Sequence, residues 1–411
     1  MESDAAATVS AVWRLESTRL VAGLARMTSD LGLAEDLTQD ALVAALEQWP
    51  AEGVPRNPGA WLMAVAKRRA VDHFRRAETL RRKTAEQGHH LEEAHVPDLD
   101  AAVDHIDDDV LRLMFLTCHP VLPPESRAAL TLRLVGGLTT SEIARGFLTK
   151  DATIGQRISR AKKALVGADF DLPTGREREE RLADVMSVIY LVFNEGYSAT
   201  AGEDWMRPDL CQEALRLARM LAALAPGTAE VHGLQALLEI QASRLPARTG
   251  PDGQMVLLEV QDRRRWDQLL VRRGLAALDR AEATGDPVGP YALQAAIAAC
   301  HARVRRAEDT DWHAIAALYD ALGGLAPSPV VEVNRAVAHG RAFGADAGLA
   351  VLDALDDKAL ARSHLLPAVR ADLLARAGRS AEAAVAFRQA AAYTRNERER
   401  ELLLGRADEI S

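Results

Sequence analysis

The stretch GGLTTSEIARGFLTKDATIGQRISRAKKAL, residues 136–165, holds two helical patterns separated by the short polar turn TKD. We predict that the first helix covers TTSEIARGFL and is capped by Thr140 or Ser141, because hydroxyl side chains accept hydrogen bonds from the free amides at a helix N-terminus. One apolar face of this helix is formed by Ile143, Ala144, Phe147 and Leu148.

The second helix is predicted over ATIGQRISRAKKALV, where apolar residues recur at a helical spacing. Its inward stripe comprises Ile154, Ile158, Ala161 and Leu165. Its outward face comprises Thr153, Gln156, Arg157, Ser159, Arg160 and Lys163. This is the helix-turn-helix arrangement, in which the second helix enters the major groove and Gln, Arg, Ser, Thr and Lys contact bases and phosphates. The alternative is an ordinary helical hairpin with a solvated basic face.

The composition indicates an all-α protein. Ala, Leu and Arg favour helices and dominate the chain, whereas aromatic residues make up only 4% of its 411 residues. This length predicts two or three domains. We find no apolar run long enough to cross a bilayer and no secretion signal at the N-terminus, so we expect a cytoplasmic location.

The cysteines give no sign of a disulfide framework or a zinc site. Cys118, Cys211 and Cys300 lie far apart in the sequence, without the CxxC spacing of metal sites, so we expect buried, reduced thiols. Three histidines, His89, His90 and His95, lie in a polar segment and are expected to be solvated. We therefore expect neither a metal ion nor another cofactor.

A basic segment, WLMAVAKRRAVDHFRRAETLRRK, covers residues 61–83. Its cations are Lys67, Arg68, Arg69, Arg75, Arg76, Arg81, Arg82 and Lys83, against the two acidic residues Asp72 and Glu78. A local basic surface of this kind binds nucleic-acid phosphates through counterion release, although the whole chain carries a formal charge of -9. Trp61 beside it suits contact with unstacked bases. The alternative is a solvated helix face whose aromatic residues belong to the core.

An acidic segment, DLGLAEDLTQDALVAALEQWP, precedes the basic one. Its expected buried stripe comprises Leu33, Leu37, Ala41, Ala44 and Ala45. Its expected acidic and polar surface patch comprises Glu35, Asp36, Gln39 and Asp40. Adjacent acidic and basic helices indicate two different partners, a protein surface for the first and a nucleic acid for the second.

We divide the chain into a helical domain over residues 8–80, a flexible linker over 81–104, a second helical domain over 105–168 and helical hairpins over 176–411. In the last part, helix pairs surround breaks at Pro226, at Pro327 and at Gly378, in a repeat of about 34 residues. This pattern predicts an α-solenoid similar to tetratricopeptide repeats.

The two N-terminal motifs resemble those of bacterial sigma factors of the extracytoplasmic-function group. AEDLTQDALVAAL followed by AWLMAVAKRRAVDHFRR is similar to region 2 of that family, and LPPESRAALTLRLVGGLTTSEIARGFLTKDATIGQRISRAKKAL is similar to region 4. The resemblance implies partners, namely the RNA polymerase core, through its largest-subunit coiled coil and its flap, and promoter DNA. It also implies a non-catalytic role in transcription initiation.

The resemblance assigns roles to individual residues. Polymerase binding falls to Asp36, Gln39 and Asp40. Binding of the melted −10 strand falls to Trp61, Lys67, Arg68, Asp72, Arg75 and Arg76, with the loop EGVPRNPG receiving a flipped base. Reading of the −35 element falls to Thr153, Gln156, Arg157, Ser159 and Arg160. Lys67, Gly155 and Asp40 depart from the residues that are common in the family at these positions.

The mechanism implied is physical rather than covalent. The linker of 24 residues can reach ~80 Å when extended, which lets the two domains bridge the −35 and −10 elements. Capture of unstacked bases, at ~1–3 kcal/mol for each stacking contact, drives strand separation. Because the polymerase provides most of the affinity, positive charge is needed only on the reading faces of an otherwise acidic chain.

The C-terminal part resembles the extension of a subgroup of these sigma factors with TPR-like domains, which implies control through the extension. The segments that carry this resemblance are VIYLVFNEGYSATAGEDWMRPDLC, GQMVLLEVQDRRRWD, YALQAAIAACHA, DTDW and VNRAVAHG. Their polar residues, Asn194, Glu195, Tyr197, Glu259, Asp262, Arg263 and Trp266, suit ion pairs and loop contacts between hairpins.

Three other functions stay open from the sequence. The polar residues of the C-terminal segments could form an enzyme site, which would need a deep pocket lined by groups such as Glu195, Asp262 and Arg263. The solenoid could instead present a groove for a peptide or a domain. The whole chain could also be a conventional helix-turn-helix regulator that binds its operator without polymerase.

Overall fold

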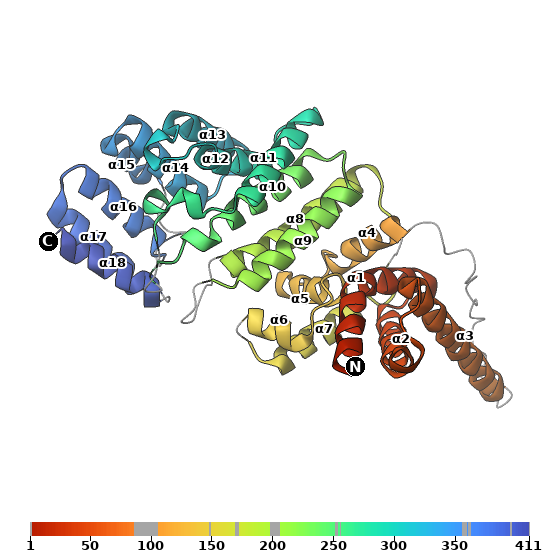
Figure 1. Ribbon diagram of the computed structural model, residues 1–411. Coiled ribbons are helices and arrows are strands. Elements are labelled where there is room, and N and C mark those ends of the chain that lie inside the picture. Colours follow the sequence, from red (N-terminus) through yellow and green to blue (C-terminus); the bar gives the residue numbers. More distant parts are fainter. Residues whose placement is uncertain are drawn as a thin grey trace. The chain divides into compact units, whose positions relative to one another are not determined.

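The computed structural model describes residues 2–85, 106–147, 149–168, 172–197, 206–250, 254, 256–355, 360, 363–394 and 397–410. Helices follow one another throughout this part of the chain, which contains no strand (Figure 1). The predicted all-α fold is therefore confirmed. None of the helices searched in it is long and apolar enough to cross a membrane.

The chain forms two compact units, Met1–Val188 and Ile189–Ser411. The boundary falls inside a single helix, α8 (Gly175–Tyr197), and not in a loop. Each unit therefore contains one part of α8. The predicted hairpin region, starting at residue 176, begins close to the start of this helix.

The helices of the first unit, besides α8, are α1 (Glu2–Thr28), α2 (Leu31–Glu52), α3 (Pro58–Ala85), α4 (Ile106–Thr117), α5 (Pro124–Leu134), α6 (Thr140–Gly146) and α7 (Asp151–Ala164). Helix α3 continues through the first five residues of the predicted linker, and the rest of the linker, with its three histidines, lies outside the described residues. Local signals explain the ends of α2: the side chain of Asp30 accepts a hydrogen bond from Leu33 N, and Gly53 adopts a φ of 83° after the last turn.

Helix α1 joins the two halves of the first unit. It packs against α2 and α3 on the one hand and against α4 on the other, while α5 packs against α7. Leu20 and Leu24 of α1 and Met114 of α4 are fully buried in this core. Thr18 Oγ1 of α1 donates a hydrogen bond to the carbonyl of Val135, at the end of α5, over 2.8 Å. The segments predicted as two separate domains thus share one compact unit.

The second unit is a succession of helices, most of which pack against the next one along the chain (Figure 1). Its α-helices after α8 are α9 (Pro208–Leu224), α10 (Ala229–Ser243), α11 (Gln268–Ala283), α12 (Pro290–Ala302), α13 (Trp312–Leu325), α14 (Pro329–Phe343), α15 (Ala345–Asp353), α16 (Leu365–Arg376), α17 (Ser380–Tyr393) and α18 (Glu397–Glu409). Its short 3-10 helices are η1 (Leu245–Ala247), η2 (Leu258–Val260), η3 (Arg263–Arg265) and η4 (Ala307–Asp309).

The breaks predicted between hairpin helices are found where the sequence placed them. Pro226 lies between α9 and α10, Ser328 caps α14 by accepting from Val331 N, and Gly378 turns the chain between α16 and α17 with a φ of 76°. Ala383 and Phe387 of α17 are buried.

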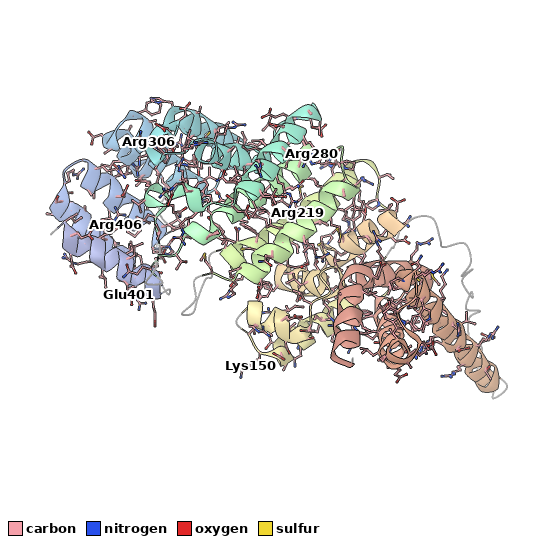
Figure 2. All side chains as sticks on the ribbon, viewed as in Figure 1. Lys150, Arg219, Arg280, Arg306, Glu401 and Arg406 are labelled. Atoms are coloured by element: carbon pink, nitrogen blue, oxygen red, sulfur yellow. The ribbon has the colours of Figure 1, made fainter. Side chains whose placement is uncertain are left out.

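Charged residues between the helices are paired inside the second unit. Arg219 and Arg280 are labelled in Figure 2, on α9 and α11. Arg219 Nε donates to the fully buried carboxylate of Glu239 on α10 over 2.9 Å, and Gln235 Nε2 donates to the same oxygen over 3.2 Å. Arg280 donates to Gln235 Oε1 over 3.3 Å, so one hydrogen-bonded chain links three helices.

Candidate nucleic-acid and polymerase interface

The first helix of the helix-turn-helix begins with a capping box. Thr139 Oγ1 accepts a hydrogen bond from Glu142 N over 3.2 Å, while the Glu142 carboxylate accepts one from Thr139 N over 2.8 Å. The predicted cap at Thr140 or Ser141 is therefore wrong, because Thr139 keeps the extended backbone of a cap residue and Thr140 is already helical. On the apolar face Ile143 and Ala144 are buried. Phe147 is half-buried, and Leu148 lies outside the described residues.

Helix α7 presents the face that sequence analysis assigned to the −35 element. The predicted inward stripe is confirmed, since Ile154, Ile158, Ala161 and Leu165 are at most 7% exposed. On the opposite face the exposed side chains are Gln156, Ser159, Arg160 and Lys163, and the half-buried ones are Thr153 and Arg157. Lys150, labelled in Figure 2, precedes the first turn and is also exposed. Such a face can contact base edges and phosphates.

Helix α3 presents the second basic face. Leu62, Ala66 and Ala70 recur every four residues and are buried. Among the predicted DNA-binding residues, Arg68, Asp72, Arg75 and Arg76 are exposed, whereas Lys67 and Arg69 are half-buried. The helix reaches Ala85, but the side chains of Arg81, Arg82 and Lys83 lie outside the described set. Exposed guanidinium groups on one helix form a suitable surface for phosphates.

Trp61 lies at the start of α3, next to the core. Its ring contacts that of the buried Trp49 edge to face, with the centroids 5.4 Å apart. Asn57, in the loop assigned to the flipped base, accepts a hydrogen bond from Ala60 N over 3.1 Å and so caps α3. Trp61 as a residue is half-buried.

The predicted polymerase patch lies on α2. Asp36 and Asp40 are exposed, and Gln39 is half-buried. Asp40 forms an ion pair with Arg69 of α3 at 2.9 Å. The side chain of Asp40 is 52% exposed and that of Arg69 is 40% exposed. The pair therefore connects the acidic patch with the basic helix, at a surface where water weakens its attraction.

Glu35 was predicted to belong to the acidic surface patch, and this prediction is wrong. Its residue is 7% exposed, and its carboxylate accepts hydrogen bonds from Arg133 of α5, over 2.7 Å, and from Lys162 of α7. Burial raises the pKa of Glu35, but Lys162 and Arg133 together hold that pKa below its usual value. The signal was present in the sequence, since Leu31, Glu35 and Thr38 share one helical face.

The polar residues considered for an enzyme site have separate structural partners. Glu195 pairs with Arg207, and the exposed Asp262 pairs with its neighbour Arg264 at 2.9 Å. Arg263 is buried and donates to backbone carbonyls.

The described part of the chain holds no group of three His, Cys, Asp or Glu side chains that could bind a metal ion. The three cysteines are free thiols; Cys118 and Cys211 are buried as expected, and Cys300 is half-buried.

Comparisons with known proteins agree with this geometry. A model of sigma-70 region 2 matches residues 14–79, and a model of sigma-70 region 4 matches residues 112–165. A family of unknown function, DUF6596, matches residues 181–282. No solved structure matches the chain.

Relatives are found both for the whole chain and for its first part. An uncharacterized protein of Rhizobium meliloti, R00370, is 45% identical over 382 residues, which cover 91% of this chain and 89% of that protein. The probable ECF RNA polymerase sigma factor SigI of Mycobacterium tuberculosis is 32% identical over 158 residues, 38% of this chain and 54% of its own. The ECF sigma factor SigK of Mycobacterium ulcerans is 28% identical over 156 residues, 36% of this chain and 78% of its own. The chain thus belongs to the extracytoplasmic-function sigma factors, as an alternative sigma factor that directs transcription initiation and carries a long helical extension.

Proposed function

We propose that α2, α3 and α7 each contact a different partner surface during transcription initiation. The acidic patch of α2, Asp36 with Gln39 and Asp40, binds the coiled coil of the largest polymerase subunit. The basic face of α3 holds the melted −10 strand, and the outward face of α7 reads the −35 element, while its domain contacts the polymerase flap. These assignments follow the family resemblance position by position.

The observation that carries the proposal is the division of α3 and α7 into two faces. Both helices bury a regular apolar stripe and leave guanidinium and amide groups exposed, Arg68 and Arg75 on α3 and Gln156 and Arg160 on α7. Exposed arginines without a core function supply the charge-assisted hydrogen bonds that phosphates and guanine accept.

We further infer that binding to polymerase separates α1–α3 from α4–α7. Both sets share a core, whereas a promoter has to be contacted at two distant elements. Besides the apolar core around α1, one partly buried contact between them is the group of Glu35, Arg133 and Lys162, whose two cationic side chains are 24% and 23% exposed. Water can therefore solvate Arg133 and Lys162 as α1–α3 and α4–α7 separate, which lowers the free-energy cost of separating these charges from Glu35.

Run-off transcription with purified core polymerase tests the proposal. We expect Asp36→Lys with Asp40→Lys to lower both core binding and transcript yield at least tenfold, because the reversed charges repel a basic partner surface. We expect Arg160→Ala to leave core binding unchanged and to lower transcription from promoters with an intact −35 element, by about five- to tenfold, the loss of one good base contact.

Matched controls use exposed residues of the same helices. Glu47→Lys changes the charge of α2 outside the patch, and Lys163→Ala removes a predicted phosphate contact instead of a base contact. Equal losses for Glu47→Lys and for the double variant would contradict the polymerase assignment. Tight operator binding by the isolated chain, with no promoter opening after core is added, would instead favour a conventional regulator.

We also infer that the second unit modulates the sigma activity and does so by binding rather than by catalysis. The separate partners of Glu195, Asp262 and Arg263 support this inference, because an acid–base pair needs its groups within hydrogen-bond reach of a common substrate.

A further inference from the structure

The second unit contains a cavity of about 300 Å³. This volume equals on the order of ten water molecules and lies at the lower end of the range of small-molecule sites. Its lining comes from α8, α10, α12, α13, α14 and η2. Several segments of the extension that are far apart in the sequence therefore meet at one place.

The electrostatic character of the cavity is positive. Among the described residues that line it, none is acidic, and Arg244 is the cation. The Arg244 guanidinium donates to two amide oxygens, those of Gln241 over 2.9 Å and Gln261 over 3.4 Å, which are neutral acceptors, and no carboxylate of the described residues forms an ion pair with it. A partly buried guanidinium with neutral partners favours an anion that takes the place of water.

A second guanidinium lies close behind the lining. Arg263 is 8% exposed and donates to the carbonyl of His301 over 2.7 Å and to Thr310 Oγ1 over 3.0 Å, which are neutral acceptors as well. Asp309 offsets part of this charge through space. The positive potential at the cavity is thus built from two buried or half-buried arginines.

His301 lines the cavity and also carries an unsatisfied polar atom. Its residue is 9% exposed, its ring contacts Trp312 edge to face at 5.3 Å, and within the described chain its Nδ1 is buried without a hydrogen-bond partner. Burial, together with Arg244 and Arg263, lowers the pKa of His301 to about 4, which keeps the ring neutral at pH 7. An unpaired buried nitrogen is costly unless a ligand or water pairs with it.

The remaining lining is rich in aromatic rings. Tyr190 and Phe193 come from α8 and Tyr319 from α13, and Tyr190 Oη donates to Gln294 Oε1 over 3.3 Å. Burial raises the pKa of Tyr319 to about 12, so its phenol stays protonated and can donate a hydrogen bond. Aromatic walls suit a flat, apolar ring.

We propose that the cavity binds a small aromatic anion, with its charged group at Arg244 and His301 and its ring between Tyr190, Phe193 and Tyr319. The charged group of the ligand supplies negatively charged acceptors for Arg244, whose acceptors in the described chain are amide oxygens. Its ring displaces water from the aromatic walls. A ligand of this class makes the extension a chemical sensor. The proposal does not depend on the assignments of α2, α3 and α7.

Calorimetric titration of the full chain, without polymerase, tests this site. The probes are benzoate, phenyl phosphate and benzamide, the last a neutral molecule of the same shape as benzoate, each up to about 10 mM, which detects millimolar affinity. We expect at least one anion to bind about tenfold more tightly than benzamide, because a hydrogen bond to a charged group contributes more than a neutral one. Equal binding of all three, or no binding at all, would overturn the proposal.

Two variants and one spectroscopic reading locate the bound anion. Arg244→Gln should remove the preference for the anion, and Arg264→Gln, whose side chain is 90% exposed, should keep it. The imidazole NMR signals of His301 should shift on titration of the unaltered chain, which keeps the test valid where Arg244→Gln fails to fold. An unchanged His301 spectrum, or a peptide with a free C-terminal carboxylate that binds more tightly than benzoate at the same place, would also refute the small-molecule site.

Discussion

At the scale of single residues, His301 shows how its surroundings set a charge state. The imidazole is buried beside Arg244 and Arg263, and its pKa falls to about 4 from an ordinary value near 6.5. The unfolded chain therefore binds a proton more readily than the folded chain. The stabilising effect of the neutral ring is complete above about pH 6.5 and is lost as the pH falls toward 4.

We expect the free energy of unfolding of the second unit to fall by up to about 3 kcal/mol through His301 between pH 7 and pH 4, since one pKa unit corresponds to about 1.4 kcal/mol. Urea unfolding at several pH values measures this effect. The quantity to compare is the slope of the free energy of unfolding against pH, in the unaltered chain and in His301→Gln. The exposed His313 provides the control, because His313→Gln should keep the slope. The same slope in all three proteins would show that His301 does not titrate as described.

At the scale of elements, the periodic spacing of apolar residues predicted the helices and their buried faces well. The stripe of α7 and the hairpin breaks follow from local sequence, because a helix in a core needs one apolar face and Pro or Gly ends it. The cap of α6 and the burial of Glu35 were missed. Three consecutive hydroxyl residues at 139–141 are equivalent in sequence, and a buried carboxylate depends on cations that are distant in the chain, Arg133 and Lys162.

The cap of α6 can be tested by a matched pair of substitutions. We expect Thr139→Ala to lower the free energy of unfolding of the first unit by about 1 kcal/mol, because the substitution removes the hydroxyl that accepts a hydrogen bond from Glu142 N and donates one to the Glu142 carboxylate. Thr140→Ala should change it by only a few tenths of a kcal/mol, since Thr140 is inside the helix and alanine is a better helix former. Urea unfolding followed by circular dichroism measures the stability change of both variants. A larger loss of stability for Thr140→Ala than for Thr139→Ala would show that Thr140 caps the helix, as predicted from the sequence.

At the scale of the whole molecule, tertiary packing decided what local patterns could not. The sequence predicted two domains on a linker, and the structure packs α1–α3 and α4–α7 into one unit through α1. The residues predicted to bind DNA or polymerase are exposed or half-buried, whereas Glu35 of the predicted acidic patch is buried. The cavity in the second unit could not be predicted, because its lining comes from segments that only the fold brings together.

We expect Glu35→Gln to loosen the contact between α1–α3 and α4–α7. The neutral amide leaves Arg133 and Lys162 close together without their shared counter-ion, so separation of the halves becomes easier. Fluorescence energy transfer between dyes at the exposed positions Glu78 and Lys163 should report a larger share of open molecules. Glu47→Gln, on the exposed side of α2, should leave the transfer efficiency unchanged, and an equal change in both variants would refute this role of Glu35.

The position of α8 has a consequence for how the two units melt. Leu182 and Val185 are buried on the part of α8 that belongs to the first unit, and Val192 and Phe193 are buried on the part that belongs to the second. Loss of order in either core frays the same helix, so thermal damage spreads across the boundary. A ligand that tightens the second unit therefore also protects the first from heat, and a chain cut at the boundary leaves each fragment with half of a shared element.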